Sequence, residues 1–237
     1  MRVPRFYVEA RLREGATVEL GGAAAHHVLR VLRLREGEAL TLFDGSGGEW
    51  DGVLLAKSHV ELKGFRDVER ESPLRITLVQ GVSSGERMDL TVQKAVELGV
   101  AAIQPVLTRK SVVRLEGSRA DARVEHWRRI AVAACEQCGR NRIPEVRALA
   151  SLEAYCATTG DPVPRLLLSP AGPSLKTMPL EAQATLAAGP EAGFMPEEET
   201  ALGSAGFAKA SLGPRILRTE TAALAALAAL NALRGDF

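Results

Sequence analysis

Cysteine is scarce in this sequence of 237 residues, which contains only Cys135, Cys138 and Cys156. An odd number of cysteines, in a chain that begins without the apolar core of a secretory leader, argues against a disulfide framework. Cys135 and Cys138 form a C-x-x-C pair, but no second cysteine or histidine pair completes a four-ligand zinc site. We therefore expect reduced thiols that serve packing, and we predict no metal.

Long apolar runs are also missing. The most apolar helical stretch, Ala222 to Leu233, is rich in alanine and is too short and too weakly apolar to span a bilayer. We therefore predict no membrane association and a cytoplasmic location.

The signatures of several large enzyme classes are absent. The sequence has no G-x-x-x-x-G-K-[ST], no H-E-x-x-H, no G-x-S-x-G and no G-x-G-x-x-G after a strand. Nucleotide hydrolysis, zinc-dependent or serine-dependent hydrolysis and dinucleotide binding are therefore disfavoured.

Net charge is close to zero, at +1, but the charge is unevenly distributed. Residues 1–35 carry seven arginines against three glutamates, and residues 109–142 carry nine basic against four acidic side chains. Such clusters can neutralise nucleic-acid phosphates locally, although two ordinary solvated faces would look the same. Arginine outnumbers lysine by 24 to 6, which suits stacking and bidentate phosphate contacts and would also follow from a GC-rich genome.

The first 70 residues are typical of a small β-domain. The turn cluster 44–48, DGSGG, separates two β-capable runs, 39–43 and 50–55, and predicts a hairpin. The spacing of apolar residues predicts one helix over 23–34, with a single face made of Ala24, His27, Val28, Val31 and Leu34. On this helix we expect His27 to be buried and His26 to be exposed.

From Leu74 onward, short apolar runs alternate with longer helical patterns, which is typical of an α/β domain. We predict strands at 76–79, 101–106, 165–168 and 184–188, and helices at 87–98, 123–138, after Pro196 and after Thr219. The charged segment from Val68 to Pro73 is predicted to be a linker. The predicted domains are therefore 1–70 and 74–237.

Two loops near the end of the chain are the strongest candidates for a binding site. GPEAGF, residues 189–194, follows a predicted strand, and SLGPRILRTET, residues 211–221, precedes a predicted helix. Glycines in such loops let the backbone approach a ligand, and prolines hold its N–H and C=O groups in set directions, as recognition of an adenine requires. A pair of tight turns without a ligand would show the same residues.

Taken together, these segments resemble the SPOUT methyltransferases, and within them the RsmE-type 16S ribosomal RNA uridine N3-methyltransferases. The resemblance spans the whole chain, and its last segment, placed after a G-P-E loop, is the most specific. The matching segments are PRF at 4–6, HHVLRVLR at 26–33, QKAVELGV at 93–100, EQCGR at 136–140, GPE at 189–191 and LGPRILRTETA at 212–222.

The resemblance implies a fold and a cofactor. It implies an α/β class with a small PUA-like β-barrel, which binds RNA, over 1–70 and a SPOUT methyltransferase domain, knotted as a trefoil, over 74–237. It further implies S-adenosylmethionine as the cofactor, a homodimer, and 16S ribosomal RNA or the assembled small subunit as the partner. The implied cofactor residues are Leu168, Ser169, Gly189, Pro190, Glu191, Gly193, Leu212, Gly213, Arg215, Ile216, Leu217 and Thr219.

The chain departs from the family pattern at two positions. Ala192 replaces a second glycine, which would cost about 1 kcal/mol if that position required positive φ. Met195 replaces a serine or threonine helix cap, at a similar cost of about 1 kcal/mol that Glu197, Glu198 and Glu199 at the helix start partly offset.

Methylation at N3 requires loss of the imide proton, so we expect a base or cations near the reacting atom. Arg218 and Arg140 are the candidate cations, and Glu191 or Glu220 is the candidate base or orienting group. Glu220 and Arg140 would also suit helix ends without any catalytic role. The candidate RNA-binding residues are Arg5, His26, Arg30, Arg33, Lys110, Arg140 and Arg142.

Two other functions remain open from the sequence. One is a SPOUT methyltransferase that acts on transfer RNA or on a ribose 2′-hydroxyl. The other is a ribosome-assembly or RNA-binding module that has kept the fold and lost catalysis.

Overall fold

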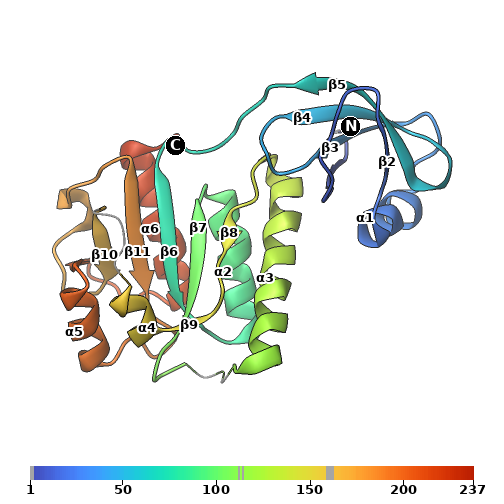
Figure 1. Ribbon diagram of the computed structural model, residues 1–237. Coiled ribbons are helices and arrows are strands. Elements are labelled where there is room, and N and C mark those ends of the chain that lie inside the picture. Colours follow the sequence, from blue (N-terminus) through green and yellow to red (C-terminus); the bar gives the residue numbers. More distant parts are fainter. Residues whose placement is uncertain (1–2, 112, 114, 159–162) are drawn as a thin grey trace. The chain divides into compact units, whose positions relative to one another are not determined.

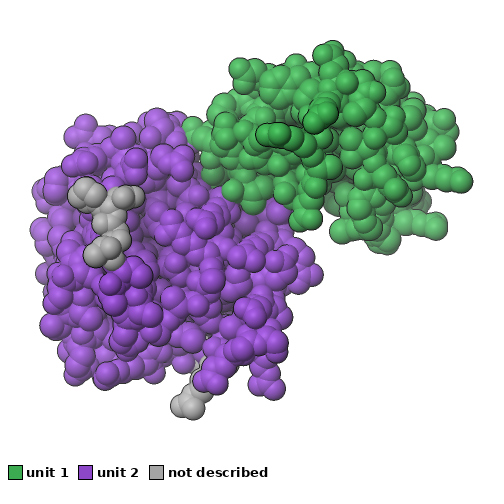
Figure 2. All heavy atoms as spheres, viewed as in Figure 1, with its two compact units in different colours: residues 1–71, 135–143 green, residues 72–134, 144–237 purple. Residues whose placement is uncertain are grey.

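The computed structural model describes residues 3–111, 113, 115–158 and 163–237. The chain divides into two compact units, shown in different colours in Figure 2. Unit 1 comprises residues 1–71 and 135–143, and unit 2 comprises 72–134 and 144–237. Within the described ranges, no helix combines the length and the apolar character needed to cross a membrane.

Unit 1 is built on a five-stranded sheet of order β1-β3-β4-β5-β2. Its strands are β1 (Arg5–Tyr7), β2 (Thr17–Glu19), β3 (Ala39–Phe43), β4 (Glu49–Leu54) and β5 (His59–Arg66), with the short helix η2 (Ala56–Ser58) before β5. β1 runs parallel to β3, and the other neighbours are antiparallel. The predicted hairpin is present as β3 and β4. Its buried side chains, among them Leu40, Leu42 and Leu54, pack with Phe6 and Val28 in one core.

The predicted helix over 23–34 takes a different form. It begins as α1 (Gly22–His26) and continues as a π-helical segment, η1 (His27–Val31), in which Leu32 N donates to His27 O at 2.9 Å. A hydrogen bond to the fifth preceding residue rotates the later side chains away from the 3.6-residue face. Val28 is buried, whereas Val31 is exposed. The prediction of a buried His27 is wrong: its ring is exposed and meets Phe6 edge-on, with 5.6 Å between ring centroids.

Unit 2 contains a parallel sheet of order β12-β10-β11-β6-β7-β8, with β9 also paired to β7 (Figure 1). The strands are β6 (Arg75–Gly81), β7 (Ala102–Leu107), β8 (Glu145–Val146), β9 (Ala150–Ser151), β10 (Arg165–Leu168), β11 (Gln183–Ala188) and β12 (Phe207–Ala210). All pairings are parallel, so the carboxyl ends of neighbouring strands lie at one edge of the sheet. Ligands of open α/β sheets bind at this edge.

Helices cover both faces of this sheet. α2 (Gly85–Glu97) and α6 (Thr219–Arg234) pack together on one face, and α4 (Leu152–Ala157) and α5 (Pro196–Ser204) pack together on the other (Figure 1). A core that includes Val79, Leu167, Ala187 and Leu202 fills the second interface. The short helix η3 (Leu175–Thr177) precedes β11.

The long helix α3 (Gly117–Cys138) has the predicted amphipathic pattern. Val124, Trp127, Ala131, Ala134 and Cys135 are buried along one face, while Arg128 and Arg129 are exposed. Arg128 Nε donates to Val146 O of β8 at 3.1 Å. The last turn of this helix belongs to unit 1.

Candidate cofactor site and the polar network of unit 1

A cavity of about 340 Å³ lies where β10, β11 and β12 end. Leu168 to Pro170 follow β10, Ala188 to Phe194 follow β11, and Ala210 to Leu217 follow β12. Thr219 and Ala222 of α6 complete the lining. The volume lies in the range of small-molecule sites, and the three strands are direct neighbours in the sheet.

Every residue predicted for the cofactor lines this one cavity, so the structure brings together segments 20 to 50 residues apart. The lining also includes Ala192, Phe194 and Ser211 of the two candidate loops, and five residues that the sequence did not point to: Pro170, Ala188, Glu199, Ala210 and Ala222. Ala210 ends β12, a four-residue strand without a predicted counterpart. A short run such as Phe207–Ala210 gives too weak an alternation to be recognised as a strand.

The loop after β12 offers its backbone to a ligand. No hydrogen bond within the described chain engages the backbone N–H groups of Leu212, Gly213, Ile216 and Leu217. Gly213 has φ +101°, a conformation that a residue with a Cβ rarely adopts. Free main-chain donors and acceptors beside apolar side chains fit the edge and the faces of an adenine, so the residues present suit S-adenosylmethionine.

The loop after β11 does not contain the strain that the sequence suggested. Its positive φ, +68°, is at Gly193, and Ala192 is not among the residues with positive φ. Gly193 N closes the turn on Pro190 O at 2.8 Å. Ala192 is therefore compatible with the loop, and Lys110 Nζ donates to its carbonyl oxygen at 3.1 Å.

The start of α5 is capped without a hydroxyl side chain. Met195 makes no side-chain cap, but the buried Glu198 carboxylate accepts from Met195 N at 2.7 Å and from Arg109 N at 2.8 Å. Two charge-assisted hydrogen bonds at the positive end of a helix replace the missing cap.

Glu191 is the acidic side chain of the cavity that is held most firmly. Its Oε1 accepts from Ser84 N, at the start of α2, at 2.7 Å and lies 3.3 Å from Arg87 Nη1. Burial alone would raise the pKa of Glu191, but the hydrogen bonds from Ser84 and the charge of Arg87 outweigh it and lower the pKa. The carboxylate is therefore ionised at neutral pH, which favours an orienting or electrostatic role over proton acceptance.

Arg218 and Glu220 flank Thr219 at the beginning of α6. Arg218 is the N-cap residue and is exposed, and within the described residues its guanidinium has no ion-pair partner. Glu220 is half-buried, and its Oε2 is inaccessible and accepts no hydrogen bond from the described residues.

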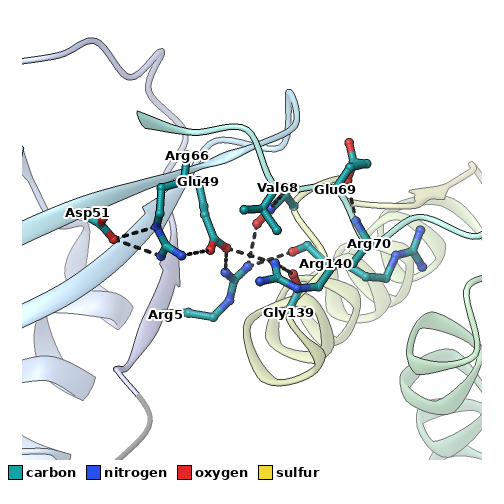
Figure 3. A network of polar contacts seen from close by, with 10 residues as sticks. Arg5, Glu49, Asp51, Arg66, Val68, Glu69, Arg70, Gly139 and Arg140 are labelled. Atoms are coloured by element: carbon teal, nitrogen blue, oxygen red, sulfur yellow. Dashed lines mark hydrogen bonds and ion pairs between the residues drawn. The ribbon is translucent and has the colours of Figure 1, made fainter. Parts of the chain in front are cut away.

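Two of the predicted RNA-binding arginines lie inside a polar network of unit 1 (Figure 3). Glu49, with 2% of its side chain exposed, accepts from Arg5 and forms ion pairs with Arg66 at 2.9 Å and Arg70 at 3.1 Å. Arg5 also donates to Asn141 Oδ1 at 2.8 Å. Arg140 has 5% of its side chain exposed and is paired with Glu71, Nε to Oε1 at 2.9 Å.

This network engages the guanidinium groups of Arg5 and Arg140 with protein acceptors. For Arg140, burial alone would lower the pKa, but the Glu71 carboxylate outweighs it and raises the pKa. The network fixes residues 139–142 to the sheet of unit 1. The predicted linker is therefore ordered by side-chain contacts, since Val68 O also accepts from Asn141 Nδ2 at 2.6 Å.

The other predicted RNA-binding residues of unit 1 are at its surface. His26, Arg30 and Arg33 are exposed, and Arg33 has φ +55°. Arg142 is exposed and its Nε lies 2.7 Å from Glu69 Oε2. Leu29 and Leu32 are exposed beside these arginines.

The C-x-x-C pair is part of unit 1. Cys135 is buried, Cys138 is partly buried, and both are free thiols. Burial raises the pKa of the Cys135 thiol to about 12, so the thiolate is not formed at neutral pH. No potential metal site of three or more His, Cys, Asp or Glu side chains is found among the residues that the structure describes.

The sheet, the cavity and the accompanying β-domain define a class, the RNA methyltransferases with a PUA-like domain. Residues 70–231 match the RNA methyltransferase domain, and residues 20–63 match the RNA methyltransferase PUA domain. The predicted fold class, an α/β methyltransferase domain preceded by a small PUA-like β-domain, is confirmed. The trefoil knot stays a prediction of the resemblance.

Individual relatives narrow the class. A ribosomal RNA small subunit methyltransferase E from Neisseria gonorrhoeae, crystallised with S-adenosyl methionine, is 40% identical, with a TM-score of 0.92 and 100% coverage of both chains. A putative methyltransferase from Legionella pneumophila, also solved with its bound cofactor, is 39% identical, with a TM-score of 0.95 and the same coverage. A ribosomal RNA small subunit methyltransferase E from Buchnera aphidicola is 30% identical over 100% of this chain and 96% of its own. The chain belongs to the ribosomal RNA small subunit methyltransferase E family.

Proposed function

We propose that this protein transfers a methyl group from S-adenosylmethionine to N3 of a specific uridine in the 16S ribosomal RNA of the small subunit. The observation that carries the proposal is that all twelve residues predicted to bind the cofactor line one cavity. The family to which the chain belongs and the cofactor bound by its solved relatives support the same reaction. Because the proposed substrate is 16S ribosomal RNA, free or in the assembled small subunit, we also propose that the protein acts in the cytoplasm.

We propose the cavity as the cofactor site. The backbone groups of Leu212, Gly213, Ile216 and Leu217 would hold the adenine, and Leu168, Ser169 and Glu191 would contact the rest of the molecule. Bound there, S-adenosylmethionine would supply an electrophilic methyl group. The ionised Glu191 adds negative charge to a site that receives a cationic cofactor.

The remaining polar groups would act on the uridine. Its imide nitrogen attacks only after losing its proton, so the chain must accept that proton and stabilise the anion. We propose Glu220 as the acceptor, because its carboxylate forms no hydrogen bond or ion pair with a described residue, whereas the Glu191 carboxylate is held through Oε1 by Ser84 and Arg87 and lacks a partner only at Oε2. Arg218, exposed at the start of α6, would stabilise the anionic base.

We propose residues 1–70 as the PUA-like RNA-binding domain and 74–237 as the SPOUT domain. The exposed His26, Arg30, Arg33 and Arg142 would contact phosphates and unpaired bases, together with Lys110 of the methyltransferase domain. Arg5 and Arg140 are proposed to support this surface from the network around Glu49 and Glu71, and Arg140 also remains a candidate cation for the reaction.

We propose that the active form is a homodimer. Ile216 lines the cavity and yet is 79% exposed, and Leu233 and Phe237 are further exposed apolar side chains of unit 2. A large apolar side chain left in solvent beside a binding site, as Ile216 is, is a feature of surfaces that a partner covers.

Transfer of labelled methyl from S-adenosylmethionine to small subunits that lack their own modification tests the proposed function. We expect label in the RNA, and N3-methyluridine after digestion to nucleosides. Labelling at another nucleoside, or labelling of transfer RNA alone, would show that the proposed substrate is wrong. Cofactor binding without any transfer would contradict the proposed reaction, and absence of both would favour an RNA-binding module.

A further inference from the structure

Gln80 is a completely buried polar side chain at the carboxyl end of β6. It has no solvent exposure, and its backbone lies between Ala188 of β11 and Pro105 of β7 in the sheet register. A buried amide costs stability where its hydrogen-bonding groups are not used, and in Gln80 the Nε2 donor is engaged while Oε1 accepts no hydrogen bond from the described residues. The contacts of this amide therefore indicate what it does.

The Gln80 amide joins three segments of unit 2. Its Nε2 donates to Gly81 O of its own strand at 3.0 Å, to Thr219 Oγ1 at 3.1 Å, and over a longer 3.4 Å to Gly189 O. The Thr219 hydroxyl in turn donates to Gly189 O. Gly189 opens the cavity loop after β11, and Thr219 is the first residue of α6, so one side chain ties together two parts of the cavity wall.

The same segments are also packed backbone against backbone. A Cβ at Gly81 would lie 2.5 Å from Pro190 Cδ and 2.6 Å from Pro190 N. Contact this close leaves no room for another side chain between β6 and the loop. The position of the loop therefore depends on Gly81 for its approach and on Gln80 for its hydrogen bonds.

We infer that Gln80 is a positioning residue for the cofactor: it holds the 189–193 loop and the start of α6 in the relative placement that S-adenosylmethionine binding requires. The inference rests on the proposed function, since it takes this cavity as the cofactor site. Gln80 itself is not among the lining residues and acts through Gly189 and Thr219.

The chain provides a matched control on the neighbouring strand. Gln104 of β7 is also buried, and its Nε2 donates to Pro105 O and to Ala148 O, each at 2.9 Å. It makes the same kind of contacts, to the next residue of its strand and to an adjacent segment. Neither Pro105 nor Ala148 lines the cavity. Loss of either amide removes buried hydrogen bonds, but only Gln80 bonds to the cavity wall.

The test compares Gln80→Met with Gln104→Met, because methionine keeps the length of glutamine and cannot donate. Thermal unfolding should show that both variants lose stability, whereas calorimetry with S-adenosylmethionine should show about a tenfold higher Kd for Q80M alone. In steady-state assays KM for the cofactor should rise in Q80M and stay at the wild-type value in Q104M. Thr219→Val combined with Q80M should raise Kd by less than the product of the single effects, because the two side chains share one hydrogen-bonded unit.

Three outcomes would overturn the inference: unchanged Kd in Q80M, an equal rise in Q104M, or full additivity with T219V. Should Q80M not fold, Gln80→Leu removes the donors without placing a charge in the core, and the same comparison of Kd with Gln104→Leu applies to it. Failure of the wild-type protein to bind S-adenosylmethionine would instead contradict the proposed function, so the two failures are distinguishable.

Discussion

Two glutamates near the cavity differ in what their oxygens contact. Each has an inaccessible Oε2 without a hydrogen bond from the described residues, but Glu191 is held through Oε1 by Ser84 N and Arg87, whereas Glu220 has no hydrogen bond or ion pair among those residues. The sequence placed both in the site and could not separate their roles. The difference between them is caused by Ser84 and Arg87 at the start of α2, which lies more than 100 residues earlier in the chain and contacts only Glu191 of the two.

The two glutamates should therefore affect different kinetic constants. We expect Glu220→Gln to lower kcat by about 100-fold, in keeping with loss of a general base, and to leave the Kd of S-adenosylmethionine unchanged. Glu191→Gln should instead raise the Kd and keep most of kcat at saturating cofactor. Single-turnover methyl transfer and calorimetry measure the two quantities. A larger kcat loss in E191Q than in E220Q would reverse the assignment.

Glu49 is the central acceptor of the polar network in unit 1. Burial alone would raise its pKa, but hydrogen bonds from Arg70 and Arg5 and the charges of these arginines lower it below its usual range. Removal of this almost unexposed carboxylate leaves the buried guanidinium of Arg5 without its carboxylate, while the other two partners, Arg66 and Arg70, are partly exposed to solvent.

Glu49→Gln should destabilise unit 1 by about 3 kcal/mol, the cost of breaking a buried ion pair. Because the pKa is lower in the folded state, this stabilisation is present above the unfolded carboxyl value of about 4.3 and is lost as pH falls through the folded value. Hydrogen exchange of β3, β4 and β5, measured at pH 7 and at decreasing pH below about 4, checks both points. The control is Glu61→Gln, which removes only an exposed pair with Lys63 and should change stability by less than about 0.5 kcal/mol. Equal effects of the two substitutions would contradict the role given to Glu49.

At the scale of elements, the loop after β11 accommodates Ala192, which departs from the family pattern. The required positive φ is at Gly193, and a Cβ there would meet no atom within 4 Å. Any cost of Gly193→Ala is therefore conformational and not steric. Ala192 lies outside the positive-φ region and has no strain to relieve.

We expect Gly193→Ala to cost about 1 kcal/mol in loop conformation and to raise the Kd of S-adenosylmethionine about fivefold. Ala192→Gly, which restores the residue usual in the family, should not tighten binding. Titration calorimetry measures the Kd of S-adenosylmethionine for both variants. Tighter binding by A192G would show that alanine strains this loop after all.

Most elements of unit 2 could be predicted from the sequence, because their apolar spacing is regular and uninterrupted. The predicted helix over 123–138 and the strand over 165–168 are examples, and they appear as α3 and β10. β8 and β9, with two residues each, are too short to show a period. β12 is as long as β10, but its sequence FAKA includes Lys209 and two small alanines, so it lacks the apolar run of β10, RLLL. The segment η1 could not be predicted, since a π-helical turn breaks the 3.6-residue spacing on which the prediction depended.

At the scale of the whole molecule, the site is assembled from segments whose proximity no local pattern encodes. The resemblance to a family selected the cofactor residues, and the parallel order β12-β10-β11 explains why they meet. Gln80 was missed because an isolated glutamine at a strand end has no distinguishing signal in one sequence. Arg5 and Arg140 were selected for their charge, because no local pattern indicates that the distant carboxylates of Glu49 and Glu71 engage them.

Light scattering should give about twice the 25.3 kDa of one chain at micromolar concentration, as a homodimer requires. Ile216→Asp should shift the population toward the monomer, because a charge replaces an exposed apolar side chain at the proposed contact. The matched control is Leu90→Asp, which changes an exposed leucine of α2. A wild-type monomer would contradict the proposed dimer.

The division of the chain between the two units also determines the order in which they can be completed during synthesis. Unit 1 includes residues 135–143, and Asn141 and Gly139 O from that segment bond to Arg5 and Arg70. The nascent N-terminal unit therefore emerges from the ribosome before the hydrogen-bond partners that residues 135–143 supply to its arginines have been synthesised. Its arginine network can form completely only after β6, α2, β7 and α3 have also been synthesised. Although it is N-terminal, unit 1 cannot finish folding before a large part of unit 2 exists.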